Sequence, residues 1–462
     1  MHLMTTVVDA DYLVVGAGAM GMAFTDALVD HAPGVRVAMV DRRHDVGGHW
    51  LAAYPFVRLH QSSQFYGVAS TLLGGGKVQE RGPEAGLHER ANQPTILAYY
   101  SDLLTGRLRD NVEFFAGCDH IGDRTFVSRV SGRRFEVPER CRVVDARYLA
   151  PDIPAELPPK FDVAPGARVV PVNDLAHVED APSQYVVTGS GKTATDACVW
   201  LLARGVDPDA ICWVRPRDPW MLNRAVVQPD PEVFLGMVAT MMESATRAGS
   251  LDDLFLRLEE AGIMLRVDRS VTPTMAKAPT LATWELDLLR TLGDVVRLGH
   301  VRSVSPGRLE LEDGSVEIAP DALVVNCAAD GLKHPPQVPI WQPSEITLQP
   351  VRAGFPCFGA AIAGYVEATR GSDEEKNAVC APSPYPDSLV QWAQMNIFGM
   401  QNAAAFGAEA DIREWAQGVP LNPARIPPGH VRTPGLDDAL ERLQTYAGPG
   451  VASLVRLAGS TR

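Results

Sequence analysis

Several features are scarce in this chain of 462 residues, and each scarcity excludes a class of protein. Basic residues number 42 against 56 acidic ones, and the net charge of −14 excludes a general binder of nucleic-acid backbones. None of the seven cysteines forms a C-x-x-C pair, which argues against a dithiol redox centre and a zinc ribbon. Their odd number argues against a disulfide framework. We therefore expect reduced thiols, no metal site and a cytoplasmic location.

Long apolar runs are also missing. No stretch reaches the roughly 18 apolar residues of a membrane span. Residues 1–10 contain no Lys or Arg, so the sequence predicts neither a signal peptide nor membrane attachment. The apolar fraction of 46% and the charged fraction of 21% are typical of globular proteins. At roughly 150 residues per domain, the length predicts about three domains.

The clearest motif lies near the start of the chain. We expect a strand over residues 12–15, a helix over 22–31 and a strand over 35–40, which together form a parallel βαβ unit. The turn between them is Gly16-x-Gly18-x-x-Gly21. In a dinucleotide-binding turn these glycines permit a tight bend, backbone contact with the pyrophosphate, and close packing of helix on strand. Asp41 follows the second strand, where a carboxylate can hold ribose hydroxyls.

The same arrangement recurs in the middle of the chain. A strand over residues 184–188, the turn Gly189-x-Gly191-x-x-Ala194, a helix over 195–204 and a strand over 210–214 predict a second βαβ unit. The position of the ribose acid is now basic, because Arg215 and Arg217 follow the second strand. Guanidinium groups there can pair with a 2′-phosphate, which favours NADPH over NADH; otherwise both arginines are simply solvated.

The two residues after Gly191 raise separate questions. Gly191-Lys192-Thr193 is similar to the end of a P-loop, but that motif needs a glycine where Val186 stands, so NTP hydrolysis is excluded. We expect Lys192 and Thr193 to lie at the cofactor pyrophosphate. A solvated lysine at the start of the helix is the alternative.

The residues after Asp41 suggest which dinucleotide the first unit binds. Gly47-Gly48 followed by His49-Trp50 resembles the FAD-binding domains of flavoproteins that bind two dinucleotides. This resemblance implies FAD contacts from Gly48, Trp50 and the neighbouring Arg42. An alternative is that Arg42 and Arg43 hold the phosphate of NADP.

Two such units, with FAD first and NADP second, resemble the flavin-containing monooxygenase superfamily, which includes N-oxygenating and Baeyer–Villiger enzymes. The resemblance runs from about residue 11 to residue 331. It includes Tyr54-Pro-x-x-Arg58, which in these families leads to an Asn or Asp near the flavin; here that place falls on His60. The resemblance implies that His60 and Gln61 are catalytic and that Arg58 binds the cofactor. Because the ordinary pKa of histidine is near neutrality, His60 could donate a hydrogen bond or shuttle a proton.

Other family motifs are degenerate. Residues 143–151 and 324–331 lie where the family chain returns between domains, but neither segment contains Ala-Thr-Gly. The fingerprint Phe-x-Gly-x-x-x-His is also incomplete after Phe161. Residues 349–356 are a candidate to face the flavin or the substrate.

The resemblance implies an α/β fold with two Rossmann-like domains, in which the NADPH domain is inserted into a discontinuous FAD domain, plus a C-terminal helical segment. We predict the first part of the FAD domain over residues 1–180, the NADPH domain with a helical insertion over 181–325, and the return with the C-terminal segment over 326–462. Patterning further predicts antiparallel strands over 111–144, helices over 232–290, a hairpin over 308–318, an amphipathic stretch over 387–417, and then turns with a short helix.

The implied activity is oxidation by FAD that NADPH has reduced. The first reading is a monooxygenase that forms a flavin C4a-hydroperoxide and uses O2 on a small organic substrate. The second is an NADPH-dependent flavin dehydrogenase or reductase without oxygen insertion, which the degenerate motifs favour. The third is a flavin-loaded redox sensor or partner-binding protein. The substrate and the oligomeric state are not encoded in any motif.

Overall fold

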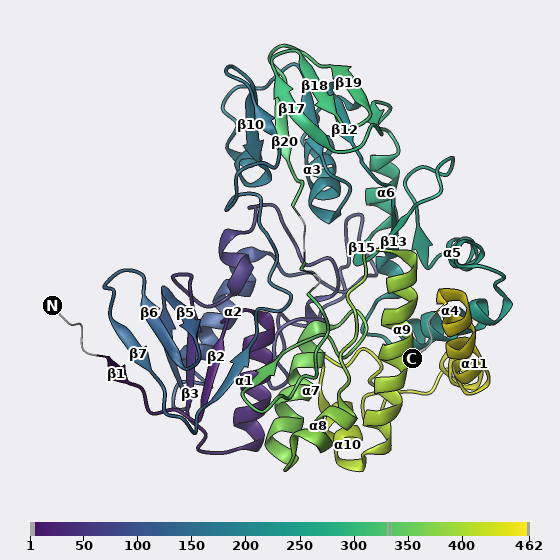
Figure 1. Cartoon of the computed structure of the whole chain (residues 1–462). Helices are drawn as coiled ribbons and strands as arrows, with labels where there is room; N and C mark the ends of the chain where they lie inside the picture. Colours follow the sequence, from purple (N-terminus) through teal and green to yellow (C-terminus); the bar gives the residue numbers. More distant parts are fainter. Residues whose placement is uncertain (1–4, 330–331, 334, 460–462) are drawn as a thin grey trace.

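The computed structural model describes residues 5–329, 332–333 and 335–459. Two five-stranded parallel sheets form its framework, and each contains one of the glycine-rich turns (Figure 1). The first has the order β21-β8-β2-β3-β4, with strands β2 Tyr12–Val15, β3 Val37–Asp41, β4 Val112–Ala116, β8 Arg142–Asp145 and β21 Glu345–Thr347. The second has the order β10-β20-β11-β12-β16, with strands β10 Arg168–Pro171, β11 Tyr185–Thr188, β12 Ile211–Val214, β16 Val295–Val296 and β20 Leu323–Asn326. The predicted α/β fold with two Rossmann-like units is confirmed.

Each face of the first sheet is covered by a different layer. Because side chains alternate along a strand, Val14 points to the layer of helices α1 Ala19–His31 and α7 Pro356–Thr369, while Leu13 and Val15 point to a small mixed sheet. The two helices pack closely, since a Cβ at Gly364 would lie 2.3 Å from the carbonyl oxygen of Phe24. The small sheet consists of β1 Thr6–Val7, β5 Cys118–Gly122, β6 Thr125–Ser128 and β7 Arg134–Glu136.

The second sheet repeats this three-layer arrangement. Val187 and Trp213 pack with helices α3 Lys192–Ala203 and α6 Thr283–Leu289, whereas Val186 and Val214 face the opposite layer. That layer contains β9 Asp162–Val163, β17 Val301–Ser305, β18 Arg308–Leu311 and β19 Gly314–Glu317. Strands β18 and β19 confirm the hairpin predicted over 308–318.

A third region lies beside both sheets, at the right of Figure 1. It contains a three-stranded sheet of β13 Pro219–Asn223, β14 Met264–Leu265 and β15 Met275–Leu281, together with helices α4 Pro231–Arg247, α5 Leu251–Glu260 and α11 Pro434–Ala458. The remaining helices are α2 Gln93–Thr105, α8 Asp373–Val379, α9 Leu389–Ala408 and α10 Ala410–Gly418. Among the described residues, no helix is both long enough and apolar enough to cross a bilayer.

Three expectations about local structure were wrong in part. Only β5 to β7 are antiparallel in the stretch 111–144; its ends form β4 and β8 of the parallel sheet, because alternation reports burial and not strand direction. The stretch 232–290 forms helices α4, α5 and α6, but residues 261–282 between α5 and α6 form turns, β14 and β15 instead. The tail, where turns and a short helix were predicted, forms the 25-residue α11 with Pro449 inside it. Gly450 permits close packing, since a Cβ there would lie 2.8 Å from the carbonyl oxygen of Met242 in α4.

The two sheets divide the chain at a different place from the predicted boundary at residue 180. Strand β10 and the short strand β9 precede that residue, yet they pair with β20 and β17 of the second unit. A division near residue 160 therefore describes the pairing of strands better. The chain returns to the first sheet at β21. Asp330 and Gly331, at the end of the family resemblance, lie outside the described residues.

Candidate functional site

The first glycine turn has the backbone geometry of a dinucleotide loop. Gly16 has φ of +110°, a conformation that favours glycine. A Cβ at Gly21 would lie 2.0 Å from the carbonyl oxygen of Gly16, so only glycine fits there. Gly18 faces Gly48, where an added Cβ would lie 2.8 Å from the Cα of Gly18. The structure therefore brings the two predicted glycine segments together at the start of α1.

Asp41 ends β3 beside this turn, and its carboxylate is buried. Its two oxygens each accept a backbone hydrogen bond of 2.8 Å, one from the N–H of Ala17 and the other from that of Arg43. A carboxylate offers about four acceptor positions, so capacity remains for ribose hydroxyls. Arg42 and Arg43 pair with Glu156 at 3.3 and 2.8 Å. Because Glu156 already pairs with both guanidinium groups, this position favours a ribose over a phosphate.

Trp50 and Arg58 are placed differently. Trp50 is buried in the turn Gly48–Ala52, and its indole N–H donates to the hydroxyl of Tyr66 at 2.5 Å. The side chain of Arg58 is exposed, and its backbone pairs with Asn92. Trp50 therefore belongs to the wall around the glycine turn, whereas Arg58 faces solvent.

The second glycine turn begins α3. Gly189 has φ of +121°, and among the described residues nothing lies within 4 Å of a Cβ added at Gly191. Lys192 forms an ion pair with Asp196 and lies 3.6 Å from a carboxylate oxygen of Glu285. The hydroxyl of Tyr54 donates to Asp196 at 2.7 Å and hydrogen-bonds Thr193. Lys192 is thus held by two carboxylates, and the start of α3 is tied to the Tyr54 segment.

Arg215 is only 1% exposed and ion-paired with Asp218, and its guanidinium lies 4.5 Å from the ring centre of Trp213. Burial lowers the pKa of Arg215, against the opposing effect of Asp218. Arg217 lies elsewhere: it is half-exposed and pairs with Asp387 at 3.0 Å. The structure therefore separates the two arginines that the sequence placed on one phosphate.

A cavity of about 420 Å³ opens beside Arg215, at the edge strand β16. Four arginines line it, accompanied by one acidic residue: Arg215, Arg269, Arg290, Arg297 and Asp268.

Two of these arginines differ in their partners. Arg297 pairs with Asp218 at 2.9 Å and with Asp268 at 2.8 Å. Arg290 instead donates to the backbone carbonyls of Val267 and Arg266, at 3.0 and 2.9 Å. The cavity therefore carries an excess of positive charge. Sequence reasoning missed Arg269, Arg290 and Arg297, because they follow no motif and converge only through the fold.

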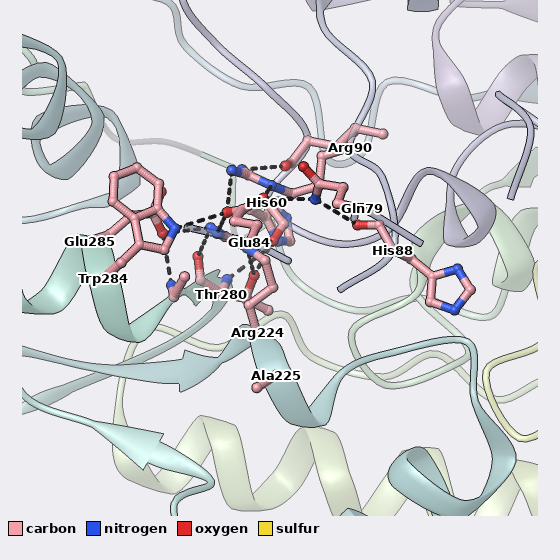
Figure 2. A network of polar contacts seen from close by, with 12 residues as sticks. His60, Gln79, Glu84, His88, Arg90, Arg224, Ala225, Thr280, Trp284 and Glu285 are labelled. Carbon is pink, nitrogen blue, oxygen red and sulfur yellow. Dashed lines mark hydrogen bonds and ion pairs between the residues drawn. The ribbon is translucent and has the colours of Figure 1, made fainter. Parts of the chain in front are cut away.

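A polar network surrounds Arg224, whose side chain has no exposed surface (Figure 2). Its guanidinium contacts Glu84 and donates to Glu285 at 2.7 Å. Arg90 also pairs with Glu84, at 2.6 Å. The carboxylate of Glu285 remains ionised: burial, which raises its pKa, is outweighed by Lys192 and Arg224, and the pKa falls to about 2.

His60 is part of this network (Figure 2). Its carbonyl oxygen accepts from the Nε of Arg224 at 2.8 Å and from the hydroxyl of Thr280. Its ring Nδ1 accepts from the backbone N–H of Thr280 at 3.3 Å. Burial, followed by the positive charges of Lys192 and Arg224, lowers the pKa of His60 to about 3. The imidazole is therefore neutral at physiological pH, unlike the near-neutral titration expected from the sequence.

Two further polar side chains are buried near these segments. Gln61 follows His60 and is buried. Arg352, in the candidate segment 349–356, is 8% exposed, and desolvation lowers its pKa to about 10. Among the described residues, no carboxylate forms an ion pair with Arg352. A buried cation without a counter-charge is costly, and an anionic ligand would relieve that cost.

Comparisons with known proteins agree with this geometry. Residues 14–56 match the family of NAD(P)-binding Rossmann-like domains. Two uncharacterized mycobacterial proteins, Rv2000 of Mycobacterium tuberculosis and Mb2023 of Mycobacterium bovis, are each 40% identical over 420 residues, which cover 90% of this chain and 78% of theirs.

Solved structures share the fold. Polycyclic ketone monooxygenase from the fungus Thermothelomyces thermophila matches with a TM-score of 0.51 and 13% identity, over 99% of this chain and 88% of that one. Cyclohexanone monooxygenase bound to ε-caprolactone matches with a TM-score of 0.50 and 15% identity, over 88% of this chain and 98% of that one. The fold that the resemblance implied is thereby confirmed.

Proposed function

We propose that this protein, which belongs to the same family as the mycobacterial protein Rv2000, is an FAD-dependent monooxygenase that NADPH reduces. FAD and NADPH are the cofactors that the Rossmann-domain match and the fold support. The observation that carries the proposal is the contrast between the two βαβ units. The first ends in a buried acid, and the second ends beside a cavity lined by arginines. When bound, FAD would accept hydride from NADPH and activate O2 for transfer to a small organic substrate.

The first unit suits FAD. Gly16, Gly18 and Gly21 let the backbone approach a pyrophosphate at the N-terminus of α1, where the helix dipole favours anions. Asp41 has acceptor capacity left for the ribose hydroxyls. Trp50 excludes water at the glycine pair, and the buried cation of Arg352 suits an anionic group.

The second unit suits NADPH. Gly189 and Gly191 leave the start of α3 accessible to a pyrophosphate. A guanidinium binds phosphate through charge-assisted hydrogen bonds, and among the described residues Arg290 donates only to neutral carbonyls. We therefore assign the 2′-phosphate to this cavity, with Arg290 as its main contact and with Arg297 and Arg215, which are already paired with acids, beside it.

Aromatic side chains close the region beside the His60 segment. The ring centres of Phe65 and Phe355 lie 5.1 Å apart, and those of Phe234 and Phe355 lie 5.6 Å apart. All three rings are buried. A dry aromatic wall protects reactive oxygen species from water, which a monooxygenase requires.

The proposal is tested with the purified full-length protein. We expect an absorbance spectrum of bound, oxidised FAD, bleaching by NADPH in the absence of O2, and incorporation of 18O from 18O2 into a product. A screen of amines, thioethers, ketones and aromatic hydroxyl compounds supplies the substrate. Bleaching followed only by release of hydrogen peroxide would instead identify a flavin reductase. A colourless protein that takes up no added FAD would contradict both activities.

A further inference from the structure

The structure fixes the protonation of His60 through a backbone group. The N–H of Thr280 donates to Nδ1 of His60 at 3.3 Å, and a backbone amide can only donate. Nδ1 must therefore carry a lone pair, which leaves the single proton of the neutral ring on Nε2. We infer that His60 acts as a neutral hydrogen-bond donor through Nε2, and that Thr280 and Arg224 are the positioning residues that hold it so. Its role toward the cofactor or substrate rests on the proposed function.

The backbone of His60 is held as firmly as its ring. Its carbonyl oxygen accepts two hydrogen bonds, from Nε of Arg224 at 2.8 Å and from the hydroxyl of Thr280. Both donors are buried, and both belong to the region that follows the second βαβ unit. Glu84 and Glu285 in turn fix the guanidinium of Arg224 from two sides. The imidazole of the first unit is therefore oriented by residues about 160 to 220 positions later in the chain.

Charges around His60 oppose a second proton on the ring. Lys192, Arg224 and Arg90 are positive and outweigh the nearby negative charge of Glu285 in their effect on the imidazole. Burial acts in the same direction because it disfavours the charged form. His60 therefore differs from a general acid–base histidine, which needs a pKa near the working pH. A fixed neutral donor suits a role in holding an acceptor oxygen in place.

The first experiment measures the tautomer directly. Full-length protein labelled with 15N-histidine is titrated by NMR from about pH 8 to about pH 5, and the His60 signal is identified by its absence in His60→Gln. We expect the neutral form with the proton on Nε2 throughout this range. A His60 that becomes protonated within it, or that carries its proton on Nδ1, would overturn the inference. This result does not depend on FAD content or turnover, so it stands apart from the test of the proposed function.

The second experiment removes one support of His60. Thr280→Val deletes the hydroxyl at nearly constant volume, and Thr274→Val is the matched control, because Thr274 is exposed in the residues just before β15. Because Thr280→Val keeps the backbone N–H that donates to Nδ1, we expect it, like the control, to keep the proton of His60 on Nε2 in the same NMR titration. Thermal unfolding of both variants identifies any general loss of folding. A proton on Nδ1 in folded Thr280→Val would show that the backbone N–H of residue 280 does not set the tautomer, and it would overturn the inference.

The third experiment separates donation from proton transfer. The amide of His60→Gln can still donate from a position close to Nε2, whereas His60→Ala cannot. We expect turnover of His60→Gln within about threefold of wild type and a loss of about tenfold or more for His60→Ala. Equal losses in the two variants, together with a pH limb in wild type that both lack, would show acid–base chemistry and overturn the inference.

Discussion

In the first sheet the strand after the glycine turn ends in Asp41, and in the second sheet Arg215 directly follows the equivalent strand. Both side chains are buried, and both are already engaged by the protein. Among the described residues, Asp41 accepts hydrogen bonds only from backbone N–H groups, whereas Arg215 is ion-paired with Asp218. The acid therefore has acceptor positions left for a ribose. Arg215 is partly neutralised, and so is Arg297, which pairs with Asp218 and Asp268, so we assign the phosphate-binding charge of the second unit mainly to Arg290 nearby.

This difference teaches that one backbone motif can serve two cofactors through the residues that surround it. The glycine turns are similar because both place a helix N-terminus at a strand end. Their surroundings differ. Gly48, which belongs to the same unit, packs against Gly18 of the first turn. The second is closed by Tyr54 from the other unit, through its contact with Asp196.

The largest expected effect comes from breaking the network that joins the two units. Arg224→Met leaves Glu84 and Glu285 buried with less positive charge, so we expect a loss of about 3–5 kcal/mol in the free energy of unfolding, measured in urea. Arg217→Met, which breaks the half-exposed pair with Asp387, should cost at most about 1 kcal/mol. Similar losses in the two variants would show that the buried ion pairs of Arg224 contribute no more to stability than the half-exposed pair of Arg217.

The next effect distinguishes the two glycine turns. Gly21→Ala places a Cβ against the carbonyl oxygen of Gly16, so we expect about 1–3 kcal/mol of destabilisation and loss of most bound FAD. Gly191→Ala meets no atom within 4 Å among the described residues, and we expect it to retain both FAD and stability. Flavin absorbance per protein and thermal unfolding are the measurements. Full FAD content in Gly21→Ala would refute the first-turn assignment.

Arg290→Gln tests the cavity of the second unit. We expect the KM for NADPH to rise about tenfold, which corresponds to roughly 1.4 kcal/mol, while the KM for NADH stays nearly constant. The change removes a guanidinium that would meet only the 2′-phosphate. Arg302→Gln, an exposed site on β17, is the control. Equal changes for NADPH and NADH would place the phosphate elsewhere.

The pH dependence of the free energy of unfolding tests the lowered pKa of His60. Its folded pKa lies below the ordinary value of about 6.5, so the unfolded chain binds more protons between those two values. Stability is therefore complete above about pH 6.5 and falls as the pH drops toward 3. The contribution of His60 is at most about 1.4 kcal/mol for each pH unit. Urea unfolding at about pH 7 and pH 5 should show a smaller decrease for His60→Gln than for wild type. An unchanged decrease would argue against a neutral imidazole with a lowered pKa.

The smallest expected effect concerns Lys192. Because Asp196 and Glu285 hold its ammonium group, Lys192 contributes to the field at the start of α3 more than to a direct contact. We expect Lys192→Met to raise the KM for NADPH and for NADH alike, by about threefold, since the pyrophosphate is common to both. Steady-state kinetics with both nucleotides measure this. A rise for NADPH alone would assign Lys192 to the 2′-phosphate.

Much of the fold was predictable because its signals are local. The strand 12–15, both glycine turns and the hairpin around residue 313 were read from runs of a few residues. The long helix α11 was missed because Pro449 and its flanking glycines resemble a turn, and only packing on α4 makes them favourable. In the site, Asp41 and Arg215 were found from their positions after a strand. Arg290, Arg297 and Arg352 have no such position, and only the fold brings them to a cavity or a buried place.

The sequence by itself determined the two βαβ units and the opposite charges that follow them, because backbone conformation and strand order depend on neighbouring residues. Only the tertiary structure decided the state of those charges and of His60. The groups that set them, such as Thr280 for His60 and Asp218 with Asp268 for Arg297, come into contact through folding. Burial and charge act through space, and both can move a pKa away from the value that the residue type suggests.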